Sequence, residues 1–310
     1  MSLRIVRIST RASISAIVVA LVLSGLGAAC SSASSDPPGT SVVASFYPLA
    51  EAAEQVGGAD VRVTNLTAPG VEPHDLELTP DQMEAITTAD VVLYLGGGFQ
   101  PAVEDAINDA EGTVVDVSEG LRDLPVPPTE TSPGLTADPH VWLDPVAYRQ
   151  VVERVESALA EVDPSTASTF ATNADALTAR LSSLDRDFRS GLASCDRSTI
   201  VTSHAAFGYL AERYGLEQVA ITGIAPEAEP TPRELESVVH QVEAVGATTV
   251  FFETLVSPRL AETVAREIGA KTAVLDPLEG LTEPETNAGE DYFSVMRENL
   301  AALREALGCR

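Results

Sequence analysis

Short apolar runs alternate with longer amphipathic stretches along most of this chain. The runs are rich in β-branched and aromatic residues, which favours strands, and the stretches between them space their apolar residues by three or four, which favours helices. Strands separated by helices of this length indicate parallel sheets with helices on their faces. The pattern predicts one series of strands over 41–48, 60–67, 91–96 and 112–118, and a second over 197–203, 216–223, 248–254 and 271–277.

Between the two series lies a stretch of a different kind. Residues 164–194 contain no strand signal and no internal glycine or proline before Gly191. Their apolar positions predict one long helix of about 40 Å at 1.5 Å per residue. The fold class predicted is therefore α/β, with lobes 41–163 and 195–310 joined by a rigid linking helix over 164–194. The apolar positions with the three-or-four spacing are Phe170, Ala174, Leu177, Leu181, Leu184 and Phe188.

The first thirty residues read as a secretion signal rather than as part of the fold. A basic start precedes an apolar run that stops at Cys30. Gly27, Ala28 and Ala29 before Cys30 are similar to a bacterial lipoprotein processing site, although such sites usually carry Leu, Val or Ile where Gly27 stands. We expect a signal peptide over 1–29, and a lipidated Cys30 with a flexible linker over 30–40. An ordinary signal peptide cut nearby is the alternative.

Charge limits the kinds of surface that the mature protein can bind. The formal charge is −27, and loss of the three arginines of the signal takes it to −30. Nucleic acid and anionic membrane are excluded as preferred partners, because phosphate binding requires a basic patch. The membrane contact expected is through the lipid anchor only. Cations are permitted, although the charge alone indicates no more than solubility.

Two cysteines, Cys195 and Cys309, remain outside the signal. A secreted protein permits disulfides, and two is an even number. We expect a bond between them that ties down the C-terminus, with two isolated thiols as the alternative. A structural zinc site built on two cysteines is disfavoured, because no further cysteine is available.

Three of the four histidines lie at or just beyond the carboxyl ends of predicted strands: His74, His140 and His204. Ligands of open α/β sheets bind at that edge, and imidazole is the commonest ligand of transition metals in proteins. His240 falls within a predicted helix and is interpreted as a surface residue. Position alone leaves open whether the other three are metal ligands or ordinary surface residues and helix caps.

Carboxylates stand close to these histidines in the sequence. Asp75 follows His74, and Asp138 and Asp144 flank His140, so they are candidates to orient the imidazole rings. In the second series, Glu253 and Asp276 end their strands and could add a ligand from the other lobe. Both could equally cap the helices that follow.

Five segments together resemble the signature motifs of a known family: EPHDLELTP, DPHVWLDP, TSHAAFGYLAERYGL, FFETLVSP and VLDPL. They are similar in order and spacing, over about 41–308, to the ZnuA/TroA-like metal-binding lipoproteins of bacterial zinc and manganese ABC importers. The resemblance implies a metal held between two α/β lobes by His74, His140, His204 and a fourth acid, which aligns with Asp276. Glu253 matches a family glutamate that is not usually a ligand, so it is a further candidate to orient an imidazole ring.

The expected function is an extracytoplasmic receptor that delivers zinc to an ABC permease and its ATPase subunit. We expect it to be monomeric, not an enzyme, and anchored to the outer face of the cytoplasmic membrane. Three imidazoles with one carboxylate suit zinc better than manganese, which prefers oxygen. The stretch 121–139 has no histidine, unlike the long histidine-rich loop of many zinc members. Manganese or iron therefore stays an alternative, and a secreted zinc hydrolase is the alternative of another class. A larger ligand such as a siderophore is disfavoured, because aromatic residues make up only 5% of the chain.

Overall fold

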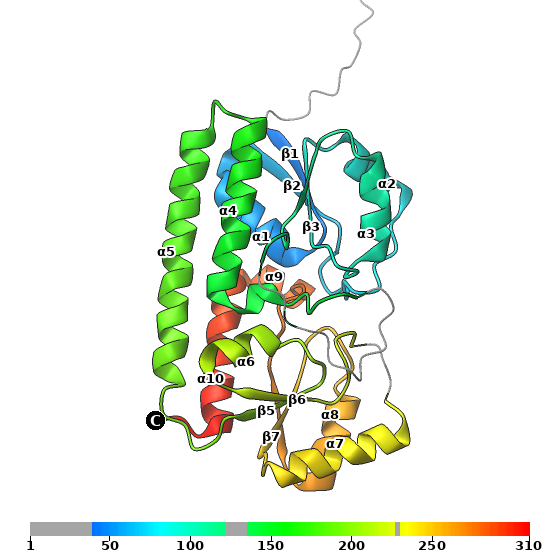
Figure 1. The fold of residues 1–310 in the computed structure, drawn as a ribbon, viewed down its shortest axis with the longest axis vertical. Coiled ribbons are helices and arrows are strands. Elements are labelled where there is room, and N and C mark those ends of the chain that lie inside the picture. The colour runs from blue at the N-terminus through cyan, green and yellow to red at the C-terminus, as the bar shows by residue number, and fades with distance from the viewer. Residues whose placement is uncertain (1–38, 122–123, 125–134, 227–229) are drawn as a thin grey trace, which may run out of the picture. The chain divides into compact units, whose positions relative to one another are not determined.

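The first half of the fold is a four-stranded parallel sheet in the order β2-β1-β3-β4. The computed structural model describes residues 39–121, 124, 135–226 and 230–310. Helices flank this sheet (Figure 1). The elements are β1 (Thr40–Ala44), α1 (Tyr47–Gly57), η1 (Gly58–Asp60), β2 (Val61–Asn65), α2 (Pro80–Thr88), β3 (Val91–Tyr94), α3 (Pro101–Ala106), η2 (Ile107–Asp109), β4 (Thr113–Asp116), η3 (Val141–Leu143) and α4 (Pro145–Val162).

The second half repeats the arrangement with two pairs of parallel strands, β5 with β6 and β7 with β8. The α/β class and the parallel pairing are confirmed, and each predicted strand is found in shortened form. The elements are β5 (Thr199–Thr202), α6 (Gly208–Tyr214), β6 (Glu217–Ala220), α7 (Pro232–Ala244), β7 (Thr249–Phe252), α8 (Arg259–Ile268), β8 (Lys271–Val274), α9 (Glu283–Ala288) and α10 (Tyr292–Leu307).

The end of the first strand and the segment after His204 show where local residues set the boundary of an element. The first strand ends at Ala44, and the helix α1 begins at Tyr47 with Pro48 in its first turn, a position that proline favours because its missing N–H is not needed there. The helix α6 begins only at Gly208, four residues after His204. The intervening backbone is an irregular turn, which holds His204 at the end of β5.

The long helix expected between the halves is α5 (Ala167–Gly191), and its six predicted apolar positions are all buried. It packs against α1 and α4 of the first half and against α10 of the second, as Figure 1 shows. Its role as the rigid link between lobes stays a prediction. The two halves also share one hydrophobic core, since the same cluster contains Phe46 and Trp142 together with Leu275 and Phe293. Residues 39–310 accordingly form one compact unit.

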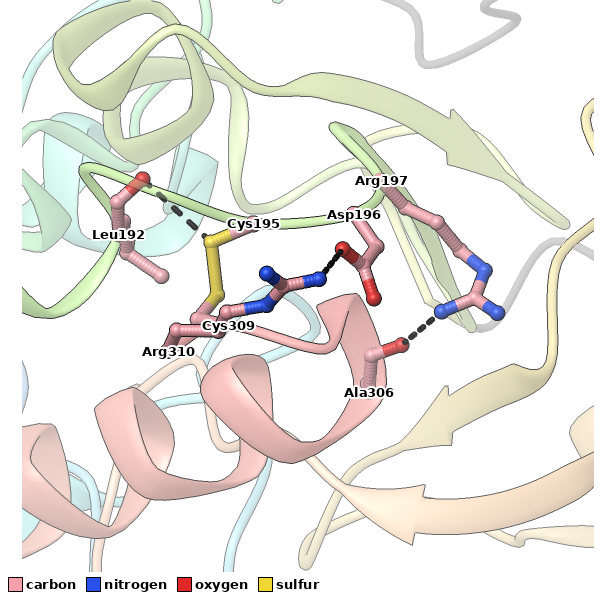
Figure 2. Close-up of a disulfide and its surroundings, with 7 residues drawn as sticks. All are labelled: Leu192, Cys195, Asp196, Arg197, Ala306, Cys309 and Arg310. Atoms are coloured by element: carbon pink, nitrogen blue, oxygen red, sulfur yellow. Dashed lines mark hydrogen bonds and ion pairs between the residues drawn. A yellow bond between two sulfur atoms is a disulfide. The ribbon is translucent and has the colours of Figure 1, made fainter.

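The C-terminus is fastened by the disulfide that we expected between Cys195 and Cys309. Figure 2 shows the bond beside an ion pair of 3.4 Å between Arg310 Nη2 and Asp196 Oδ1. Backbone N–H groups of Asp196 and Arg197 also donate to the carbonyl of Leu307, at 3.0 and 3.1 Å. The end of α10 is thereby joined to the segment that leads into β5.

The expected signal peptide over 1–29 and the lipidation site Cys30 lie outside the described residues, as does most of the linker over 30–40. Among the residues described, none of the helices is both long and apolar enough to span a membrane.

A buried carboxyl group in α1 gives the first testable expectation. Burial, with the nearby charges of Asp291 and Glu54, raises the pKa of Glu51 to about 7. The folded state therefore holds this proton more tightly than the unfolded chain, so the free energy of unfolding should fall as the pH rises from about 4.5 through about 7. Above that range the group is ionised, and its burial lowers the free energy of unfolding by a constant amount.

Replacing Glu51 with glutamine should raise the free energy of unfolding at pH 8 by about 3 kcal/mol more than it does at pH 4.5, because the amide does not ionise. The amide is itself poorly partnered, which lowers the stability of the variant equally at both pH values and leaves the difference between them unchanged. Urea unfolding at both pH values measures the difference. The same substitution at the exposed Glu84 of α2 is the control, and an equal gain there would contradict this account.

Candidate metal centre

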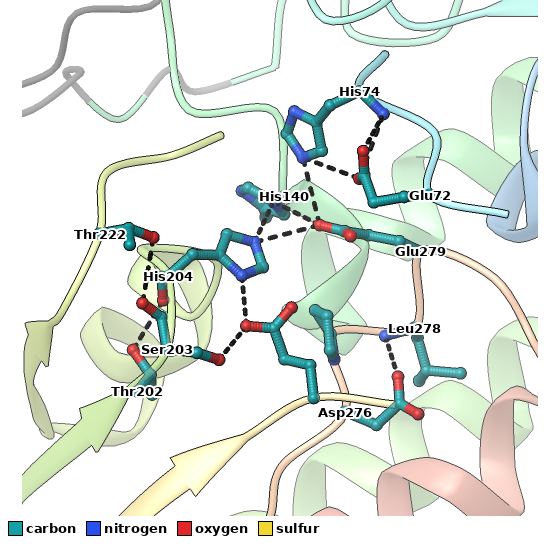
Figure 3. A network of polar contacts seen from close by, with 12 residues as sticks. Glu72, His74, His140, Thr202, Ser203, His204, Thr222, Asp276, Leu278 and Glu279 are labelled. Carbon is teal, nitrogen blue, oxygen red and sulfur yellow. Dashed lines mark hydrogen bonds and ion pairs between the residues drawn. The ribbon is translucent and has the colours of Figure 1, made fainter. Parts of the chain in front are cut away.

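Four buried side chains from both halves of the fold meet at one point: His74, His140, His204 and Glu279. Each offers one ligand atom, and these four atoms lie within 4.8 Å of one another. Figure 3 shows the three imidazole rings turned toward the carboxylate of Glu279. His74 lies between β2 and α2, His140 directly before η3, His204 just after β5 and Glu279 between β8 and α9. The three histidines predicted from the sequence are thus brought together.

The spacing of the ligand atoms suits a tetrahedral metal. Glu279 Oε1 lies 3.3 Å from His74 Nε2, 3.0 Å from His140 Nε2 and 3.2 Å from His204 Nε2. The Nε2 atoms of His140 and His204 are 3.4 Å apart. Zinc–ligand bonds of ~2.0–2.1 Å place neighbouring corners of a tetrahedron about 3.3 Å apart. These four distances therefore match four of the six edges of such a coordination shell.

Asp138 orients His140 from behind the ring, as expected. Its Oδ1 lies 2.7 Å from His140 Nδ1, and it also accepts the backbone N–H of His140 at 3.0 Å. The proton on Nδ1 leaves the lone pair of Nε2 directed into the cluster. A carboxylate on the far side of a ligand imidazole fixes its tautomer and raises its basicity.

Glu253 does the same for His204. Its Oε1 lies 2.6 Å from His204 Nδ1 and also accepts the hydroxyl of Ser203. Glu253 follows directly after β7, so the strand end places its carboxylate behind the ring rather than inside the cluster. Glu253 is therefore arranged to orient a ligand, in agreement with the role expected of it.

The electrostatics of the cluster favour positive charge between the rings. Burial acts to lower the pKa of His140 and of His204, but the neighbouring carboxylates outweigh it and raise both, that of His204 strongly. Burial alone would raise the pKa of Glu279, yet the imidazoles of His204 and His74 hold it well below its usual range. At His74 burial prevails and lowers the pKa. Because protons and a metal compete for the same lone pairs, a divalent cation can replace the protons.

Asp276 does not lie in this cluster, contrary to the sequence expectation. Its Oδ2 accepts the hydroxyl of Thr254 and its Oδ1 accepts the backbone N–H of Leu278, both at 2.7 Å. Burial raises the pKa of Asp276 to about 7. The two hydrogen bonds fold the chain into a turn in which Leu278 has a φ of 55°, the left-handed region. Glu279 lies three residues after Asp276, and the turn carries it into the place that we had expected Asp276 to fill.

Asp75 and Asp144 are also placed differently from the expectation that they orient imidazoles. Asp75 is exposed, and the acid beside His74 is instead Glu72, which accepts the backbone N–H of His74 at 3.0 Å. Asp144 caps α4 instead, by accepting the N–H of Val146 at 2.8 Å. His240 lies on the surface of α7 with its side chain 70% exposed, as expected.

Trp142, the only tryptophan, connects two of the ligand-bearing segments. Its indole N–H donates to the carbonyl of Pro277 at 2.7 Å, and its ring lies 5.2 Å from that of His140. Trp142, two positions after His140, thereby anchors the turn that carries Glu279. Tyr292 in turn donates its hydroxyl to the carbonyl of Trp142 at 2.7 Å.

Substituting Trp142 with phenylalanine should weaken metal binding by roughly three- to tenfold, the effect of one lost hydrogen bond. The ring would still fill the core, while the turn carrying Glu279 would lose its anchor. Competition with a chromophoric chelator measures this affinity without relying on tryptophan fluorescence. Tyr292→Phe, which removes the bond to the Trp142 carbonyl but not the bond to Pro277, is the comparison. An unchanged affinity in Trp142→Phe would show that the anchor is not needed.

Comparison with known proteins agrees with this geometry. The family ZnuA, described as zinc-uptake complex component A periplasmic, matches residues 42–306. The zinc-binding lipoprotein AdcA of Streptococcus pneumoniae is 36% identical over 302 residues, 93% of this chain and 60% of that protein. The high-affinity zinc uptake system protein ZnuA of Bacillus subtilis is 32% identical over 300 residues, 93% of this chain and 94% of that one.

A solved structure has the same fold. The Zn(II)-bound ZnuA-like domain of Streptococcus pneumoniae AdcA is 37% identical, with a TM-score of 0.74 over 87% of this chain and 99% of that domain. The chain spans only 55–60% of the length of the streptococcal AdcA proteins, and 94% of the Bacillus protein. With the family match covering nearly all of the described fold, this chain belongs to the ZnuA family.

Proposed function

We propose that this protein is an extracytoplasmic solute-binding protein that captures zinc and delivers it to an ABC importer. The observation that carries the proposal is the convergence of three imidazole nitrogens and one carboxylate oxygen at tetrahedral spacing. All four side chains are at most 7% exposed. Glu279 Oε2 is buried with no hydrogen-bond partner among the described residues, which supports a cation as its missing partner.

The three imidazoles and one carboxylate form a complete set of four ligands, which supports ion binding over catalysis. A zinc hydrolase keeps one position open for a water and places a general base beside it. Here Glu279 would fill the fourth corner, and Glu253, the candidate base, is engaged on the far side of His204. The arrangement suits a bound ion and would leave no open coordination position for a substrate water.

Zinc is supported over manganese or iron by the donor atoms. Three nitrogens and a single carboxylate in a tetrahedron are typical of zinc, whereas manganese prefers more oxygen ligands in an octahedron. Two relatives, a zinc-binding lipoprotein and a zinc uptake protein, support the same metal.

The cellular setting follows from the same relatives and from the N-terminal sequence. We propose that residues 1–29 are removed, that Cys30 is lipidated, and that residues up to 40 tether the protein to the outer face of the cytoplasmic membrane. There it would act as a monomer with an ABC permease and its ATPase. The lobes would be 41–163 and 195–310, linked by 164–194.

Titration calorimetry at pH 7, with native mass spectrometry of the purified protein, tests the proposal. We expect one zinc per chain, bound more tightly than about 1 μM, and manganese bound far more weakly. His140→Ala should abolish tight binding, whereas His240→Ala, on the exposed surface of α7, should not alter it. Zinc binding weaker than micromolar, or manganese binding as tight as zinc, would overturn the assignment.

A further inference from the structure

A groove of about 420 Å³ lies between β8 and α10, lined by none of the four residues of the metal centre. Along one wall run the four residues of β8, from Lys271 to Val274. The facing wall is formed by α10, and Asp276 lies at the end of the groove nearest the turn that carries Glu279.

The wall formed by β8 is an unpaired strand edge. The N–H of Lys271 donates to Thr248 and that of Leu275 donates to Phe252, so the odd-numbered residues of β8 pair with the β7 side. Since neighbouring residues of a strand direct their N–H and C=O to opposite sides, those of Thr272 and Val274 point away from β7. Among the described residues, β8 has no second strand neighbour, and both residues are exposed.

The next position along the same edge is already paired, and by a side chain. Asn299 of α10 accepts the N–H of Asp276 at 2.8 Å and donates to its carbonyl at 2.7 Å. This is the pair of hydrogen bonds that an added strand would make at that position. Asn299 therefore ends the open edge at Asp276 and leaves the positions of Thr272 and Val274 available.

Charge distinguishes between possible occupants of the groove. Its lining contains the exposed Glu298 and Glu305 and the half-buried Glu285, against one basic residue, Lys271, which lies 3.8 Å from Glu305. A second copy pairing edge to edge would bring the same acids together. A segment bearing lysine or arginine would meet complementary charge.

We propose that this groove binds an extended, basic segment of a partner protein, which adds to the open edge of β8 as a further strand. Backbone hydrogen bonds to Thr272 and Val274 would supply the affinity, and Glu298 and Glu305 would select basic side chains. Exposed strand edges are usually protected by a charge, a bulge or a proline. In β8 the only charged residue is Lys271, at the start of the strand. The proposal does not depend on the identity of the metal.

Amide hydrogen exchange of the full mature chain tests this with a blocked hexapeptide of alternating lysine and valine, in about 0.15 M salt to screen unspecific attraction. We expect slower exchange at Thr272 and Val274 on adding the peptide, and no change with the glutamate–valine counterpart. No protection at these two amides would overturn the proposal. Protection that grows with protein concentration in the absence of peptide would overturn it in favour of a second copy.

Two variants separate backbone pairing from charge. Val274→Pro removes an N–H that β7 does not use and should abolish peptide binding, with an unchanged zinc affinity as the check on folding. The double variant Glu298→Gln with Glu305→Gln should weaken binding of the basic peptide by about tenfold. Glu236→Gln with Glu243→Gln on α7 makes the same change of net charge outside the groove and should leave binding unaltered. Equal weakening by both charge pairs, or undiminished binding to Val274→Pro, would contradict strand addition.

Discussion

Replacing Glu279 with glutamine is expected to weaken zinc binding by roughly 100-fold or more, which corresponds to about 2.7 kcal/mol or more. Glutamine keeps the size of the side chain but removes the negative charge that faces all three imidazoles. A neutral amide is also a poor zinc ligand compared with a carboxylate. Competition with a chromophoric chelator at pH 7 measures the loss, and thermal unfolding with and without zinc provides a second readout through the stabilisation that a bound ion confers.

Asp276→Asn is the matched comparison, since the two acids lie three residues apart on the same turn. Asparagine can still accept the N–H of Leu278, so the turn should persist and zinc affinity should fall by less than about tenfold. The two variants together decide which acid completes the coordination shell. A larger loss in Asp276→Asn than in Glu279→Gln would return the fourth ligand to the position expected from the sequence.

The backbone path explains why the sequence pointed to Asp276. Asp276 lies just beyond the end of β8, where ligands of parallel sheets gather, and nothing in a linear pattern signals that the chain then turns back. The turn depends on the left-handed backbone of Leu278 and on contacts with Thr254, Asn299 and Trp142, which are far away in sequence. His140 and His204 needed no such information, because each lies next to a regular element. His74 lies in the loop between β2 and α2, and its motif EPHDLELTP was what identified it.

A regularity near two of the histidines became clear only from the geometry. Glu72 and Asp138 each stand two residues before a histidine, with a proline between, and each accepts the backbone N–H of that histidine. Asp75 lies in the turn from Pro73 to Leu76, closed by the N–H of Leu76 donating to the carbonyl of Pro73, and its side chain is exposed. The acid–proline–histidine spacing was present in the sequence, and would have favoured Glu72 over Asp75.

Removing the carboxylate behind His204 is the second large effect that we expect. Glu253→Ala should weaken zinc binding by about 10- to 100-fold, the usual result of losing a partner that orients a ligand histidine. The imidazole would lose both the acceptor that fixes its tautomer and the charge that raises its basicity. Ser203 would lose its acceptor at the same time, and chelator competition at pH 7 again measures the outcome.

Glu253→Gln separates the two contributions. Its amide oxygen can still accept the Nδ1 proton of His204, so a loss much smaller than in Glu253→Ala would assign the effect to ring orientation, and an equal loss would assign it to charge. Asp138→Ala should resemble Glu253→Ala, because Asp138 holds His140 in the same way. Asp75→Asn, an exposed acid beside His74, should leave the affinity unchanged. If Asp75→Asn weakened zinc as much as Glu253→Ala, the general loss of negative charge, and not the contact behind the ring, would be the cause.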